Sequence, residues 1–99
     1  MARRGRTKKN SSAEVEGILQ ERRSSYGDFT KVASITEGMR GAAMEGANWS
    51  NLDDQTKVAL FFIMNKIARV VEGTLTKDSI RDIQGYAELI LTHSTNIKG

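Results

Sequence analysis

The sequence contains no cysteine and no proline, and it has a single histidine, His93. Without cysteine the chain has neither disulfides nor thiolate ligands, and one imidazole is too few for the usual zinc sites. The Ser-His-Asp and Cys-His catalytic groups, the P-loop and the G-x-G-x-x-G motif are lacking as well. These absences exclude redox and zinc chemistry, and the lack of proline agrees with long helices.

Long hydrophobic runs are also lacking. No stretch approaches the roughly 18 uninterrupted apolar residues of a membrane span, and the charged N-terminus has no apolar signal-peptide segment. We therefore expect a soluble, cytoplasmic protein without a membrane partner. Ninety-nine residues form at most one domain, with a core small enough to gain from association. We expect residues 11–99 to form one all-α domain of about four helices, a small bundle completed by homo-oligomerisation.

Positive charge is concentrated at the N-terminus. The formal net charge is +3, and five of the fifteen basic residues are Arg3, Arg4, Arg6, Lys8 and Lys9. The remainder carries ten basic against twelve acidic side chains, a net charge of −2. Because such a segment cannot bury apolar surface, we expect residues 1–10 to form a disordered basic arm. The arm either contacts the phosphates of a nucleic acid or only increases solubility.

Helical periodicity predicts two helices in the first half of the chain. Ser11 and Glu14 have the spacing of a capping box, which predicts a helix from there to about Ser24. Asp28 can cap a second helix with apolar positions at helical spacing. Three glycines in this segment predict a kink, fraying or very close packing: Gly38, Gly41 and Gly46.

The second half of the chain predicts two further helices. After a loop, Ser50 or Asn51 can cap a third helix that ends at Gly73. Residues 58–64 are apolar on all sides of this helix, which predicts that it is central and buried. The last helix opens at residue 76 or 77.

Two pairs of charged residues share helix faces. Lys66 and Arg69 lie three positions apart on the third helix, and Asp78 and Asp82 lie four apart on the last. In one interpretation the carboxylates hold Mg²⁺ while Lys66 and Arg69 neutralise the phosphates of a nucleotide. In the other, Asp82 forms an interhelical salt bridge with Arg69 or Lys66, and Asp78 complements the helix dipole. Spacing alone favours the salt bridge.

A glycine turn lies between two aromatic residues, Tyr26 and Phe29. These rings can stack on a nucleotide base, although such aromatics more often fix the angle between two helices. Gly85, next to Tyr86 in the last helix, predicts close approach of a second helix or of a ligand.

Three segments together carry a resemblance: ILQERRSSYGDF at 18–29, NKIARVVEG at 65–73 and KDSIRDIQGYAELI at 77–90. Their E-R-x-x-x-Y-G, K-x-x-R and D-x-x-x-D-x-x-G-Y-A motifs resemble a family of small phage and prophage proteins without an assigned function. The pattern also resembles phage nucleotide-modification-associated domains and, more distantly, the all-α MazG-type nucleotide pyrophosphohydrolases. The resemblance implies roles for the motif residues, which are Glu21, Arg22, Tyr26, Gly27, Lys66, Arg69, Asp78, Asp82, Gly85 and Tyr86.

The chain departs from the MazG-type pattern on its third helix. Those enzymes carry an E-E-x-x-E carboxylate cluster, whereas this helix offers Lys66, Arg69 and only Glu72. We therefore expect binding of a nucleotide or nucleotide-derived signal, for nucleotide metabolism or counter-defence, rather than catalysis. The alternatives are a Mg²⁺-dependent nucleotide hydrolase, with Asp78 and Asp82 as metal ligands, and a nucleic-acid or host-protein binder that uses the arm. The expected ligand-binding residues are Arg22, Tyr26, Gly27, Lys66, Arg69 and Tyr86.

Overall fold

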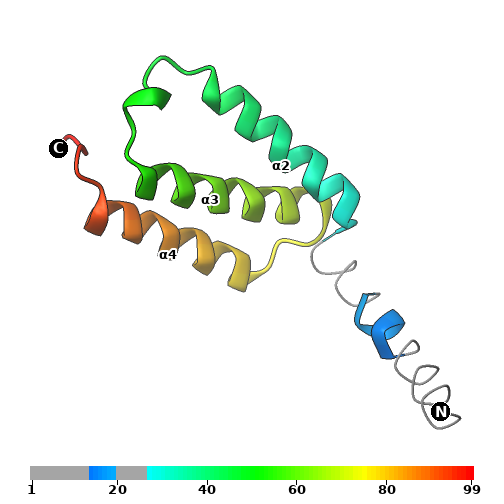
Figure 1. The fold of residues 1–99 in the computed structure, drawn as a ribbon. Coiled ribbons are helices and arrows are strands. Elements are labelled where there is room, and N and C mark those ends of the chain that lie inside the picture. Colours follow the sequence, from blue (N-terminus) through cyan, green and yellow to red (C-terminus); the bar gives the residue numbers. More distant parts are fainter. Residues whose placement is uncertain (1–13, 20–26) are drawn as a thin grey trace, which may run out of the picture.

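The computed structural model describes residues 14–19 and 27–99, and every regular element in this part is helical (Figure 1). Residues 14–19 are helical. They are followed by α2 (Phe29–Met44), the short 3₁₀ helix η1 (Trp49–Asn51), α3 (Asp54–Glu72) and α4 (Lys77–His93). The all-α prediction is therefore confirmed. The capping box at Ser11 and the basic arm lie outside the described residues.

Helix α3 lies in the middle of a single layer. It packs against α2 on one side and against α4 on the other, and successive helices run in opposite directions (Figure 1). The central position of α3 is as predicted, but the described helices form a layer rather than a closed bundle. None of these helices is both long and apolar enough to cross a membrane.

The predicted cap at Asp28 is confirmed, and so is the predicted start of the last helix at residue 76 or 77. The Asp28 carboxylate accepts hydrogen bonds from the backbone N–H groups of Thr30, at 2.9 Å, and Lys31, at 3.3 Å, at the start of α2. The Thr76 hydroxyl accepts from the N–H of Ser79 at 3.1 Å at the start of α4. Each side chain supplies an acceptor for first-turn donors that have no partner within the helix.

The predicted cap of α3 is wrong. Asp53 takes this position, because its carboxylate accepts from the N–H of Thr56 at 2.9 Å. Ser50 and Asn51 instead belong to η1, which closes through a bond from the N–H of Leu52 to a carbonyl within η1. Several neighbouring residues here have side chains suited to capping, so the sequence alone does not distinguish among them.

Asp53 also joins the start of α3 to the end of α4. Its Oδ2 accepts from the Ser94 hydroxyl at 3.1 Å and from the N–H of Thr95 at 2.6 Å. The Thr56 hydroxyl and the N–H groups of Thr95 and Thr56 hold the pKa of Asp53 well below its ordinary value. The Thr56 hydroxyl has no partner within hydrogen-bond geometry in the described chain, so it acts on Asp53 only as a nearby dipole.

Replacing Asp53 with asparagine is expected to remove an acid-sensitive part of the stability. A carboxyl group whose pKa is lower in the folded than in the unfolded state stabilises the fold above its unfolded value of about 3.9. This stabilisation is lost as the pH falls below that value. Urea unfolding between about pH 6 and about pH 3 should therefore show a steeper loss of stability in the wild type than in Asp53→Asn. Parallel pH profiles would contradict this role of Asp53.

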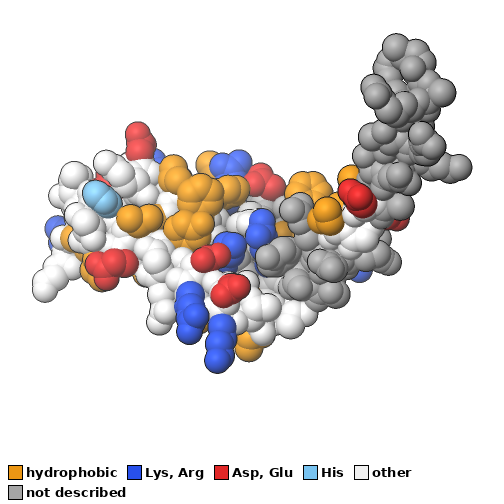
Figure 2. All heavy atoms as spheres, turned by 90° about the horizontal axis from the view of Figure 1, so that it is seen from below, with side chains coloured by type: hydrophobic (Ala, Val, Ile, Leu, Met, Phe, Trp, Pro, Cys, Tyr) orange, Lys and Arg blue, Asp and Glu red, His pale blue; other side chains and the backbone are white. Residues whose placement is uncertain are grey.

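The core of the layer is small. Its buried residues are Val32, Thr36, Thr56, Ala59, Ala68 and Ser79, and no large side chain of the described chain is fully buried. Hydrophobic side chains gather at the surface (Figure 2), and on α3 Val58 is 52% and Val71 is 64% exposed. The prediction that α3 is buried all round is therefore wrong for the described residues, because a single layer leaves two sides of its central helix open.

The glycines of α2 and α4 do not mark tight contacts. A methyl group at Gly38, Gly41 or Gly85 would meet no neighbouring atom within 4 Å in the described chain, apart from its own helix. Helix α2 runs unbroken through its two glycines and ends before Gly46. The predicted kink in α2 and the close approach of a second helix at Gly85 are therefore both wrong for this part of the chain, whereas approach of a ligand at Gly85 stays a prediction.

Candidate functional site

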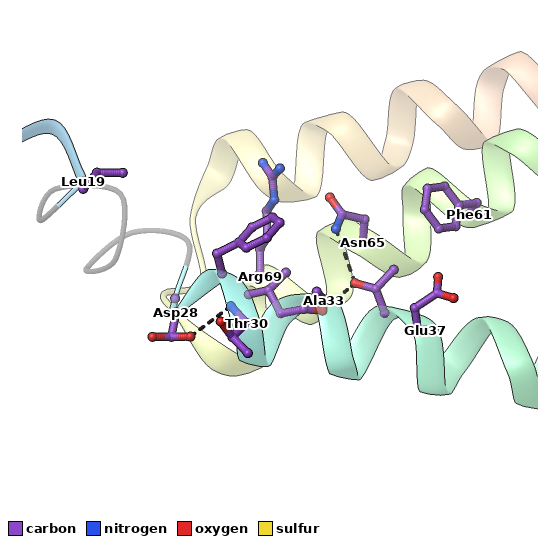
Figure 3. A pocket seen from close by; sticks show the side chains of 12 residues that line it. Leu19, Asp28, Thr30, Ala33, Glu37, Phe61, Asn65 and Arg69 are labelled. Atoms are coloured by element: carbon purple, nitrogen blue, oxygen red, sulfur yellow. Dashed lines mark hydrogen bonds between the residues drawn. The ribbon is translucent and has the colours of Figure 1, made fainter. Parts of the chain in front are cut away.

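A cavity of about 580 Å³ opens between α2 and α3, near the start of α2 and the end of α3 (Figure 3). This volume lies in the range of small-molecule sites, about 300–1,000 Å³. Its described lining comes from the segment before α2 and from both helices: Leu19, Gly27, Asp28, Phe29, Thr30, Val32, Ala33, Thr36, Glu37, Phe61, Asn65 and Arg69. The wall combines aromatic rings, hydroxyl and amide groups, one guanidinium group, and the carboxylates of Asp28 and Glu37.

The α3 wall of the cavity is a stripe of three side chains. Phe61, Asn65 and Arg69 follow one another at four-residue spacing, which puts them on one face of the helix. The Asn65 amide donates to Thr36 Oγ1 at 3.3 Å, and the Thr36 hydroxyl donates to the carbonyl of Val32 at 2.7 Å. These bonds hold the side-chain oxygen of Asn65 turned away from Thr36 (Figure 3).

The electrostatic character changes along the cavity. Arg69 supplies a positive charge at the end near Gly27. At the other end Glu37 forms an ion pair with Arg40, with Nε at 3.1 Å from Oε2, and the Arg40 guanidinium lies 6.0 Å from the centre of the Phe61 ring. The acid at that end is therefore paired within α2, whereas near the start of α2 the cavity is lined by the guanidinium of Arg69 and the carboxylate of Asp28.

A second hollow continues the cavity along the layer. It has a volume of about 450 Å³ and shares Glu37 and Phe61 with the first cavity. Its lining also includes Trp49 and Lys57, whose Nζ lies 5.9 Å from the Trp49 ring. The two hollows therefore lie next to each other along the α2–α3 boundary.

Gly27 allows the chain to pass close to the end of α3. Its φ is +87°, a conformation that favours glycine. A Cβ at this position would lie 2.5 Å from Cγ of Glu72 and 3.0 Å from the backbone carbonyl carbon of Glu72. The predicted glycine turn is therefore also a point of close approach, and it forms one wall of the cavity.

The structure brings together only part of the predicted ligand-binding set. Gly27 and Arg69 line the cavity, whereas Lys66 and Tyr86 are not among its described lining residues. Arg22 and Tyr26 lie outside the described residues, as do the nucleic-acid candidates Arg3, Arg4, Arg6, Lys8 and Lys9. Arg69 is thus the predicted cation that the fold places in the cavity.

Lys66 and Tyr86 make contacts between α3 and α4 instead. Lys66 Nζ lies 2.8 Å from Asp82 Oδ2, with the two side chains 16% and 48% exposed, respectively. The Tyr86 ring packs against Phe62 at a centroid distance of 5.1 Å. The interhelical salt bridge, which spacing had favoured, is therefore confirmed, with Lys66 as the partner of Asp82.

The acidic candidates do not form a larger cluster. Among the described residues no group of three or more His, Asp or Glu side chains could hold a metal ion together. Asp82 lies against Lys66. The Mg²⁺ site at Asp78 and Asp82 stays a prediction that rests on helical spacing alone.

Sequence reasoning missed Asn65, Thr36 and Phe61 as lining residues. Phe61 belongs to the apolar run of α3, which predicts a buried helix, and Asn65 directly follows that run. The four-residue spacing from Phe61 through Asn65 to Arg69 is the signal that could have revealed this wall.

Comparison with known proteins gave one family match. The model of a domain of unknown function, DUF6378, matches residues 12–93, which is most of the chain. No curated protein and no solved structure matches the chain.

Proposed function

The chain belongs to the DUF6378 family, and we propose that it binds a nucleotide or a related small phosphate-bearing ligand in the cavity between α2 and α3. The observation that carries this proposal is the α3 wall, where Arg69 and Asn65 stand four residues apart beside the ring of Phe61. A cation, an amide and an aromatic surface suit the three parts of a nucleotide.

Arg69 is the group proposed to bind phosphate. A guanidinium donates two parallel hydrogen bonds to phosphate oxygens, and such charge-assisted bonds are stronger than neutral ones. The N-terminus of α2 is less suited, because the N–H groups of Thr30 and Lys31 already donate to the Asp28 carboxylate. That carboxylate also repels a further anion.

The aromatic side chains are proposed to hold the base. Phe29 is 83% exposed at the edge of the cavity, although a phenyl ring in water is unfavourable. Stacking a base on this ring, or on Phe61 inside the cavity, buries apolar surface without requiring a particular base. Asn65 then offers its side-chain oxygen as an acceptor for a base or sugar donor.

Calorimetric titration of the full chain with mono-, di- and cyclic nucleotides tests the proposal. Arg69→Gln is expected to weaken binding by about 10- to 100-fold, because a hydrogen bond to a charged group contributes about 1.5–3 kcal/mol. Arg69→Lys keeps the charge but loses the paired donors, so its affinity should lie between those of the wild type and Arg69→Gln. Thermal unfolding of each variant shows whether the fold is intact.

Arg81→Gln provides a matched control, because Arg81 is an exposed arginine of α4 outside the cavity lining. It should bind the ligand as the wild type does. An equal loss of affinity in both glutamine variants would mean a diffuse charge effect instead of a site. Absence of binding across the whole nucleotide panel would refute the proposed function.

A further inference from the structure

The side of α3 away from the cavity is apolar. Leu60, Met64, Ile67 and Val71 recur at intervals of three or four residues, so they form one stripe along the helix. The charged side chains in the second half of α3 point elsewhere: Arg69 lines the cavity, Lys66 pairs with Asp82, and Glu72 meets Gly27. The stripe therefore carries no charge.

The flanking helices extend this stripe on the same side of the layer. On α4, Ile80 and Leu91 lie on the side opposite Asp82, which pairs with Lys66 on a side of α3 that is turned away from the stripe. On α2, Ile35 and Met39 lie away from the cavity-lining Ala33 and Glu37. We call the stripe together with Ile80 and Leu91 the apolar face.

The apolar face is open to solvent in the single chain. Val71 and Leu91 are 64% and 65% exposed, and Ile67 and Ile80 are exposed as well. An uncharged face with several exposed large aliphatic side chains is typical of a surface that is covered by another protein surface.

We propose that a second copy of this chain covers the apolar face, so that two three-helix layers pack against each other. The area agrees with such a dimer. Helices of 16 to 19 residues are about 25 Å long. Three such helices side by side, with about 8–10 Å between neighbouring axes, form a layer that is also about 25 Å wide. One whole side of the layer, of which the apolar face is a part, therefore measures about 600 Å², close to the roughly 800 Å² that each partner contributes to a stable interface.

Two further observations favour a second copy over a segment of the same chain. The described N-terminal helical residues lie on the other side of the layer, because Leu19 lines the cavity. Residues 1–12 contain few apolar side chains to cover the face. In addition, two uncharged faces meet without like-charge repulsion, as a two-fold symmetric contact requires.

The dimer supplies the core that the single layer lacks. No large side chain of the described chain is fully buried, and packing two apolar faces together would bury Met64, Ile67 and Val71 between the layers. The cavity between α2 and α3 would stay open on the outer side of each protomer.

Light scattering after size exclusion, over a range of protein concentrations, tests the proposal directly. The wild type is expected at about 22 kDa, twice the chain mass of 11.0 kDa. Val71→Asp should weaken association by at least about 100-fold, because it would bury two unpaired carboxylates in one interface. Val58→Asp is the matched control, since Val58 is an exposed valine of the same helix outside the stripe.

Each outcome decides the proposal. A dimeric wild type and Val58→Asp, with a monomeric Val71→Asp, supports it. A wild type that stays at 11.0 kDa, a Val71→Asp variant that stays dimeric, or equal dissociation of both variants overturns it. If Val71→Asp does not fold, the melting temperature of the wild type decides: it rises with protein concentration for the dimer, and a constant value overturns the proposal.

Discussion

Gly27→Ala is expected to destabilise the protein by about 2–4 kcal/mol. Left-handed backbone costs a non-glycine residue about 1–2 kcal/mol, and the φ of Gly27 is +87°. The new methyl group would also lie 2.5 Å from Cγ and 3.0 Å from the backbone carbonyl carbon of Glu72. The Glu72 side chain can move, but the end of α3 must shift to relieve the backbone contact. Urea unfolding measures the loss, a large share of the 5–15 kcal/mol typical of a domain.

The same substitution in α2 provides the control. Gly38 lies in a regular helix, and a methyl group there meets no neighbouring atom of the described chain. Gly38→Ala is therefore expected to stabilise the protein by about 0.5–1 kcal/mol, through the higher helix propensity of alanine. If both variants shift the unfolding midpoint in the same direction, the close approach at Gly27 does not control stability.

Ala68→Leu is expected to destabilise the protein by up to about 3 kcal/mol. Ala68 is fully buried. It lies three residues after Asn65, which donates to Thr36 of α2, so it faces α2 across the helix boundary. A leucine there adds three carbons at a point where the two helices approach closely, and α2 must move outward to accommodate them.

Ala47→Leu tests whether this effect comes from packing. Ala47 is exposed between α2 and η1, so the same added volume meets solvent. The unfolding free energy of Ala47→Leu should stay within about 0.5 kcal/mol of the wild type. A similar stability of Ala68→Leu and the wild type would show that the α2–α3 boundary has room for the larger side chain.

Local signals in the sequence predicted where the helices lie, but not which of their faces are buried. The cap at Asp28 and the start of the last helix near residue 76 depend on a few neighbouring atoms, and both are confirmed. The burial of α3 depends on what packs around it, and an apolar run does not state how many sides are covered. Val58 and Val71 are accordingly exposed on a helix that periodicity predicts as buried.

The candidate site was likewise predicted only in part. The salt bridge of Asp82 was predicted with either Arg69 or Lys66, because both lie within one turn of α3. The rotation of α3 about its axis selects Lys66 for Asp82 and places Arg69 in the cavity. That rotation is fixed by the packing of α3 against two neighbouring helices. The residue spacing along a single helix carries no information about this packing.

The bonds of Asp53 have a consequence for how the three helices are held together. They join residue 53 to residues 94 and 95, so the start of α3 and the end of α4 close a ring of about forty residues. Helix α2 lies outside this ring and is held by its packing on α3 and by the loop around η1. The layer thus consists of a closed hairpin and one helix packed beside it, and the cavity lies along the boundary between these two parts.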